Sequence, residues 1–175
     1  MNNKVKFPVG YTVEDIVFNL RLMEYVNSID FYNKSTISCL KRKDSITATF
    51  NEKLGKIFLF IDKEIRKFYK NNDIDTVQNN NKRKQLLARN TIIYINSMYT
   101  KKCKWSYEKK KITANNFLNK KTVSEAFNVK SINPYFNSKF KIIYLKLMFK
   151  LIKHDFNDFS FRVTSILNQL RNIGV

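Results

Sequence analysis

Apolar side chains return at the three- and four-residue spacing of an α-helix over most of this chain. The clearest stretch begins after Asn51 and ends near Lys70. Its apolar face consists of Leu54, Ile57, Phe58, Ile61, Ile65 and Phe68. Such a stripe buries one side of a helix against a core and leaves the other side in water. The pattern predicts a mostly α, bundle-like fold of about six to seven helices.

The same spacing, together with capping residues, locates the other helices. They are predicted at about 13–28, 84–99, 114–119, 122–128, 134–153 and 159–172. Thr12 and Asp15 resemble a capping box, Asn133 and Pro134 suit a helix start, and Gly174 suits a helix end. The alternation from Ser45 to Phe50 indicates either a short β element or the approach to the next helix.

The longest polar run in the chain lies at residues 70–84, KNNDIDTVQNNNKRK. Because it lacks apolar periodicity, residues 71–83 are predicted to be a linker or loop. This prediction divides the chain into an N-terminal helical part, 1–70, and a C-terminal basic helical part, 84–175. The two parts either form separate units or pack together as one domain.

Positive charge dominates the composition. Lys and Arg total 33 against 14 Asp and Glu, which gives a formal net charge of +19. The chain is rich in Lys, Asn, Ile, Phe and Tyr and holds only 3 Gly and 2 Pro, which indicates an AT-rich genome. That bias favours Lys over Arg but does not remove Asp and Glu. Self-repulsion at this charge opposes compaction unless a polyanion offsets it, so a nucleic acid is the predicted partner. An anionic membrane or an acidic protein is the alternative.

The segment 101–111, KKCKWSYEKKK, places six lysines around Trp105 and Tyr107. The lysines are Lys101, Lys102, Lys104, Lys109, Lys110 and Lys111. Lysines neutralise phosphates, and exposed aromatic rings stack on unpaired bases for ~1–3 kcal/mol per base. The segment is therefore a predicted nucleic-acid contact. Alternatively, Trp105 turns inward as a core anchor and the lysines belong to a solvated loop.

A second basic surface is predicted on the helix that follows Pro134. Lys139, Lys146, Lys150 and Lys153 fall within about 60° of one another at ~100° per residue. They form either a phosphate-binding edge or an ordinary solvated edge.

Smaller basic groups spread the charge along the chain. They are Lys41, Arg42 and Lys43; Lys63, Arg66, Lys67 and Lys70; and Lys82, Arg83 and Lys84. This spread suits a protein embedded in folded RNA. The excess of Lys over Arg favours recognition of backbone and shape, because base reading relies on planar side chains such as Arg.

Residues 122–136, TVSEAFNVKSINPYF, resemble a helix-turn-helix module. Val123, Ala126 and Phe127 would pack its first helix, and the helix after Asn133 would enter a DNA groove. The arrangement is similar to the end of the cyclin-like repeats of B-type transcription initiation factors, where a helix like 88–99 precedes it. The usual turn glycine is absent and Pro134 falls in the expected reading helix. The resemblance implies a DNA-binding element at 122–153.

Catalytic and metal-binding patterns are not evident in the sequence. The single histidine, His154, lies beside Asp155 past a predicted helix end, where a surface histidine is expected. Asp73 and Asp75 lack a third ligand for a cation. Cys39 and Cys103 have no metal-site spacing and are expected to be free thiols, although a disulfide is possible. These features predict a protein that is not an enzyme and has no cofactor or metal.

Apolar stretches are too short for a membrane span, and the N-terminus lacks the apolar core of a signal peptide. A reducing compartment is expected, such as an organelle matrix, the cytoplasm or a viral factory. The leading hypothesis is a structural RNA-binding component of a ribosome or other ribonucleoprotein, in contact with other proteins of a large complex. The alternatives are a DNA-binding protein for regulation, replication or packaging, and an accessory subunit of a polymerase-type complex.

Overall fold

The computed structural model describes residues 5–9, 14–34, 49–133 and 138–173, with side chains as far as Leu170. These residues form seven helices and no strand, which confirms the predicted mostly α, bundle-like fold. The helices are α1 Glu14–Met23, α2 Leu54–Asn71, α3 Val77–Met98, α4 Tyr107–Leu118, α5 Lys121–Ala126, α6 Lys139–Lys153 and α7 Asn157–Ile173. Of the possible β element at 45–50, residues 45–48 lie outside the described part of the chain, and Thr49 and Phe50 belong to no strand.

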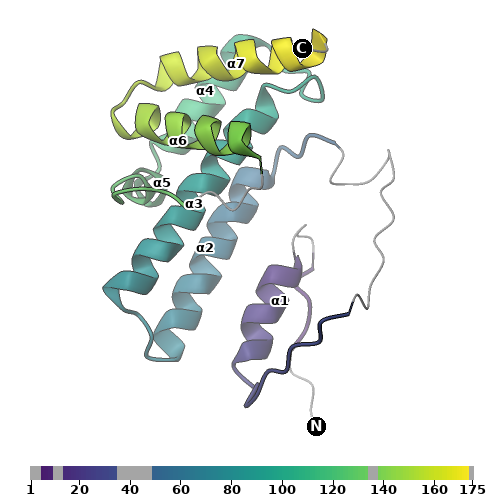
Figure 1. Ribbon diagram of the computed structural model, residues 1–175, viewed down its shortest axis with the longest axis vertical. Helices are drawn as coiled ribbons and strands as arrows, with labels where there is room; N and C mark the ends of the chain where they lie inside the picture. Colours follow the sequence, from purple (N-terminus) through teal and green to yellow (C-terminus); the bar gives the residue numbers. More distant parts are fainter. Residues whose placement is uncertain (1–4, 10–13, 35–48, 134–137, 174–175) are drawn as a thin grey trace.

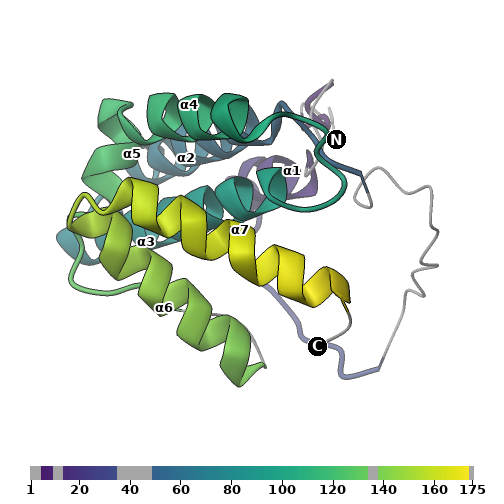
Figure 2. The same ribbon diagram turned by 90° about the horizontal axis from the view of Figure 1, so that it is seen from above.

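Two helical hairpins make up most of the bundle (Figure 1). The first consists of α2 and α3, and α1 packs along α2. The second consists of α6 and α7, which lie side by side and cross one end of the first hairpin (Figure 2). Because α3 contacts α2, α4, α5 and α6, it is the central helix of the fold.

Burial follows this arrangement. Ile92, Ile95 and Met98 of α3 are at most 1% exposed and lie in the main core with side chains from α4 to α7. A smaller cluster joins Val17 of α1 to three isoleucines of α2. The apolar stripe that predicted α2 therefore faces the interior and leaves the opposite side of α2 in solvent.

The α2–α3 connection is shorter than the sequence indicated. Only residues 72–76 separate the two helices, so the predicted linker or loop at 71–83 includes the first two turns of α3. The helix begins at Val77 because the Thr76 side chain accepts a hydrogen bond from the backbone N–H of Asn79, at 3.2 Å. The cap fixes where the helix begins, although the polar run itself has no apolar stripe.

A buried ion pair also holds this first part of α3 in place. The Arg83 guanidinium donates two hydrogen bonds to the carboxylate of Asp62 on α2, at 2.5 and 2.6 Å. The two side chains are only 7% and 6% exposed. Burial raises the pKa of the Asp62 carboxyl above its ordinary value, and Arg83 opposes that rise. Arg83, predicted to contact nucleic acid, instead joins α3 to α2.

The end of α1 and the start of α4 also differ from their predictions. Helix α1 ends at Met23 and not near residue 28, while its predicted cap, Thr12, lies outside the described residues. Helix α4 begins at Tyr107 and not at 114, because Ser106 accepts a hydrogen bond from the Lys109 N–H at 3.3 Å. The connector between α3 and α4 is thus residues 99–106.

The segment that resembled a helix-turn-helix has a different geometry. Helix α5 ends at Ala126 and α6 begins at Lys139, so residues 127–138 separate them. A helix-turn-helix joins its two helices by a turn of about three to four residues. Helix α6 therefore does not begin at the predicted position after Asn133, and Pro134 lies outside the described residues.

Polar side chains join α3 to the second hairpin. The Tyr144 hydroxyl lies 3.0 Å from the Thr164 hydroxyl and donates to the Asn96 side-chain oxygen at 3.3 Å. The Asn168 amide donates to the same oxygen at 2.9 Å. Burial raises the pKa of Tyr144 to about 12, so its hydroxyl stays protonated in neutral solution. The network fixes the position of α6 and α7 on α3.

Candidate nucleic-acid interface

The lysines of segment 101–111 divide into two groups. Lys101, Lys102 and Lys104 lie exposed on the connector. The other three lie in the first turns of α4, where each contacts a neighbouring side chain of the protein. The Nζ atom of Lys109 lies 4.2 Å from the Trp105 ring centroid, that of Lys110 lies 5.8 Å from the Tyr99 centroid, and that of Lys111 lies 2.7 Å from Asp158 Oδ2.

The two aromatic residues of this segment also differ. Trp105 is half-buried against the main core, with its ring edge-on to Phe50 at a centroid distance of 5.1 Å. This contact favours the core-anchor interpretation of Trp105. Tyr107 remains 39% exposed, and its ring meets that of Tyr99 edge-on at 6.0 Å. Tyr107 is therefore the ring in this segment that has an accessible face.

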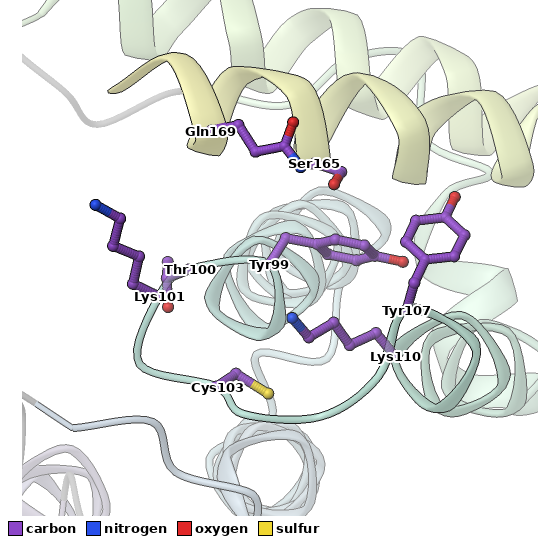
Figure 3. A pocket seen from close by; sticks show the side chains of 8 residues that line it. All are labelled: Tyr99, Thr100, Lys101, Cys103, Tyr107, Lys110, Ser165 and Gln169. Carbon is purple, nitrogen blue, oxygen red and sulfur yellow. The ribbon is translucent and has the colours of Figure 1, made fainter. Parts of the chain in front are cut away.

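The structure places part of the segment around a pocket of about 570 Å³, which we call the connector pocket (Figure 3). Its lining residues are Tyr99, Thr100, Lys101, Cys103, Tyr107, Lys110, Ser165 and Gln169. One wall comes from the predicted segment, and Ser165 and Gln169 come from α7. The sequence did not indicate this second wall, because α7 is far from the connector along the chain.

On α6, three of the four predicted lysines form one exposed row. Lys139, Lys146 and Lys150 are exposed, and we call them the α6 lysine row. Lys153 is half-buried, and its Nζ donates to the backbone oxygen of Val129 at 2.7 Å. Lys153 therefore anchors the end of α6 and does not extend the row.

The predicted group at 82–84 is divided by the helix that contains it. Lys82 is exposed, Lys84 is half-buried, and Arg83 pairs with Asp62 as described above. Consecutive residues in a helix point about 100° apart, so three adjacent cations cannot share one surface. The group Lys41–Lys43 lies outside the described residues.

A larger basic surface lies on α2. Its members are exposed and lie opposite the apolar stripe. They are Lys56, Lys63, Arg66, Lys67 and Lys70, which we call the α2 basic face. At ~1.5 Å per residue the face extends roughly 21 Å. Four of these residues were predicted only as part of the charge spread along the chain, although their three- and four-residue spacing places them on one side of a helix.

Apolar side chains are exposed next to the α6 lysine row. Phe140, Ile143 and Leu147 of α6 are 64%, 66% and 41% exposed. On α7, Phe159, Ile166 and Leu170 are 56%, 54% and 46% exposed. We call these six residues the α6–α7 apolar surface.

Helix geometry relates the two stripes. Phe140 and Leu147 lie four residues before and three after Tyr144, whose hydroxyl reaches Thr164 on α7, so the α6 stripe runs along the edge nearest α7. On α7, Phe159, Ile166 and Leu170 lie about 120–160° around the helix from Thr164, so they face away from the side that contacts Tyr144. The two stripes are therefore exposed faces of two neighbouring helices.

Other candidate groups have structural surroundings. His154 is exposed just past α6, and Asp155 follows it with a φ of 61°, a conformation that ends the helix. Within the described residues, no three His, Cys, Asp or Glu side chains gather as metal ligands would. Cys103 is a buried free thiol, and Cys39 is outside the described residues. None of the helices described here combines the length and apolarity needed to cross a membrane.

These features define an all-α bundle with several exposed basic surfaces. A comparison of the chain with protein-family models, curated proteins and solved structures finds no match.

Proposed function

We propose that this chain is a non-enzymatic nucleic-acid-binding protein, and that folded RNA in a ribosome or other ribonucleoprotein is its ligand. The observation that carries the proposal is the α2 basic face. Five cations lie exposed along roughly 21 Å of one helix, on the side opposite the core. They add little to the packing of α2, while they are well placed to replace the counterions of a phosphate backbone.

The distribution of the other basic groups favours RNA over duplex DNA. The α2 basic face lies on α2, the α6 lysine row lies on α6, and the connector pocket lies between the connector, the start of α4 and α7. Separate basic surfaces suit a ligand that folds around the protein. A straight duplex would meet one face, and DNA binding through 122–153 has no helix-turn-helix geometry to support it.

The test is a salt titration of RNA binding. Replacing Lys63, Lys67 and Lys70 by Gln lowers the net charge from +19 to +16. Each lost contact with a single strand lowers the slope of log affinity against log salt by about 0.7, so the expected loss is about 2. The matched control replaces the exposed Lys120, Lys121 and Lys130 and makes the same charge change.

Equal effects of the two triple variants would contradict a role for the α2 basic face. Absence of measurable RNA binding by the unaltered protein near physiological salt would contradict the proposed function itself. Tighter binding to duplex DNA than to RNA at equal salt would instead support the DNA-binding alternative.

A second candidate function, as a partner-binding subunit of a polymerase-type complex, is favoured by the α6–α7 apolar surface. Contiguous exposed apolar side chains commonly mark a protein interface. The adjoining α6 lysine row requires a partner that carries opposite charge. We therefore commit to one occupant, an amphipathic helix of another protein with acidic side chains beside its apolar face. A second copy of this chain, also at +19, would meet like charge.

A designed peptide pair tests this surface. One peptide carries Leu at helical spacing flanked by Glu, and the other replaces each Glu by Lys. The acidic peptide is expected to bind the protein, and Ile143→Ser with Ile166→Ser is expected to abolish binding. Equal binding of the basic peptide, no binding of either peptide, or self-association that the double variant removes would each contradict the acidic-helix partner.

A further inference from the structure

The connector pocket is an open hollow with the volume of a small-ligand site. Its volume of about 570 Å³ lies within the usual ~300–1,000 Å³ of such sites. The connector and the start of α4 form one wall, and α7 forms the other (Figure 3). Its lining residues come from the connector, the first turn of α4 and α7, so the pocket exists only when these distant segments pack together.

The chemistry of the lining combines three kinds of group. Tyr99 and Tyr107 provide aromatic rings, and Lys101 and Lys110 provide cations. On the facing wall, Ser165 and Gln169 point from α7 toward the Tyr99 ring (Figure 3). Their hydroxyl and amide groups both donate and accept hydrogen bonds. None of the eight lining residues is acidic, and the neighbouring Asp158 is paired with Lys111 at 2.7 Å.

One buried group at this pocket lacks a partner. Tyr99 is 7% exposed, and no described residue forms a hydrogen bond with its hydroxyl. Buried hydroxyl groups are usually satisfied, so an unpaired one calls for an explanation. The hydroxyl points toward Tyr107, whose side chain is 39% exposed (Figure 3). If the Tyr107 side chain turns outward, the Tyr99 hydroxyl becomes a donor at the pocket wall.

Burial also keeps that hydroxyl in its donating form. It raises the pKa of Tyr99 well above its ordinary value, and nearby Tyr107 and Asp158 act in the same direction. The phenol is therefore protonated in neutral solution and suited to a ligand that accepts a hydrogen bond, such as a base carbonyl or ring nitrogen.

We infer that the connector pocket binds one unpaired nucleotide of a single-stranded RNA. In the bound state the Tyr107 side chain turns outward and the base stacks on its ring. The polar edge of the base meets Gln169, Ser165 and the uncovered Tyr99 hydroxyl, and its phosphate lies near Lys101 and Lys110. A base within a duplex could not enter, because its faces and pairing edge are occupied. This inference rests on the proposed RNA-binding function and assigns the site at which that function distinguishes unpaired from paired strands.

The first experiment compares two strands of equal charge, an oligouridine and an abasic oligonucleotide of the same length. Stacking of one base corresponds to roughly a 5- to 150-fold gain in affinity. The unaltered protein is therefore expected to bind the oligouridine more tightly by a factor in that range. Tyr107→Ala should lower the affinity for the oligouridine to that for the abasic strand and leave the affinity for the abasic strand unchanged.

The matched control is Tyr32→Ala, which removes another exposed tyrosine, 69% exposed and outside the pocket. It should leave both affinities unchanged. Lys101→Gln with Lys110→Gln should lower the affinity for both strands equally, because both strands carry phosphates.

Tyr99→Phe gives a readout that a purely structural role would not. Removing an unsatisfied buried hydroxyl should leave the melting temperature unchanged or raise it, while affinity for the oligouridine falls and affinity for the abasic strand does not. An equal loss of affinity for both strands, or no change in either affinity, would show that this hydroxyl is not part of the site.

The outcomes separate the inference from the proposed function. RNA binding that ignores the bases and the Tyr107 substitution would overturn the pocket assignment and leave the proposed function intact. Failure to bind either strand would overturn both. Uridine monophosphate that binds more tightly than the oligouridine would identify a free-nucleotide site and overturn the assignment to a strand.

Discussion

At the scale of single residues, the Asp62–Arg83 pair governs how α3 meets α2. Both side chains are buried, and two short hydrogen bonds hold the charges together. A buried pair of this kind contributes little over apolar packing, but losing one partner leaves an unpaired buried charge. We expect Arg83→Met to lower the free energy of unfolding by about 3–5 kcal/mol near neutral pH.

This loss should depend on pH in a defined direction. Without Arg83, the pKa of Asp62 rises above its already raised value. A carboxyl with a higher pKa in the folded than in the unfolded chain stabilises the fold when protonated, and this contribution is lost as pH rises through the raised value. The difference between variant and unaltered protein, measured by urea unfolding, should therefore shrink toward acid pH. A pH-independent difference would contradict the role of charge, and Asp62→Leu with Arg83→Met should recover most of the stability.

A second residue shows how closely the helices approach. A Cβ atom added at Gly55 would lie 2.6 Å from Cε1 of Tyr94 and 3.0 Å from Cε2 of Phe117. Glycine at this position therefore allows α2 to contact the rings of α3 and α4. With only three glycines in the chain, this one is explained by packing and not by a turn.

At the scale of elements, the α6 lysine row should contribute to the binding of duplex RNA and not of single-stranded RNA. Lys139, Lys146 and Lys150 lie along one side of a straight helix, which suits the regular phosphate spacing of a duplex. Replacing the three by Gln should lower the salt slope for duplex RNA by about 3, at ~0.9 per phosphate. Oligouridine binding at the connector pocket should be preserved, and equal loss of both activities would contradict two separate surfaces.

The sequence predicted the elements better than the site. Helices α2 and α7 followed from apolar stripes, whereas the start of α3 was missed because its first turns depend on the Thr76 cap and on the distant Asp62. Likewise, Ser106 begins α4 earlier than the apolar spacing indicated. Local patterns report that a segment is helical, but caps and ion pairs decide where the helix begins. They do not always report the buried face, because Ile166 and Leu170 of the α7 stripe are 54% and 46% exposed.

For the candidate site, the sequence identified the connector but not its surroundings. Whether Trp105 faces the core depends on Phe50, more than fifty residues away, and the second wall of the pocket depends on Ser165 and Gln169. The α2 basic face had a readable spacing, and it was missed because four of its charges were considered as part of an overall spread. Contacts between distant segments are set by packing, which periodicity does not report.

At the scale of the whole molecule, a net charge of +19 opposes folding through self-repulsion. Salt screens this repulsion, so the melting temperature should be higher at about 0.5 M than at about 0.02 M sodium chloride. These two concentrations lie above and below physiological ionic strength. A polyanion that binds only the folded chain, present at about 100 times its Kd, should raise the free energy of unfolding by about 2.7 kcal/mol. This corresponds to a rise in melting temperature of roughly 5–10 °C. Differential scanning calorimetry with polyphosphate measures the rise caused by the polyanion, with dextran as the uncharged control. A melting temperature that falls with added salt would contradict the role of self-repulsion.

The central position of α3 has a consequence for how the protein opens. Its amides are enclosed by α2, α4, α5 and α6, so solvent can reach them only when several helices separate at once. In deuterium oxide, the backbone amides of residues 87–98 should therefore exchange last and report the global free energy of unfolding. The amides of α1, which is held mainly by α2, should exchange through a separate opening of lower free energy. The N-terminal helix can then detach without disturbing the rest of the bundle.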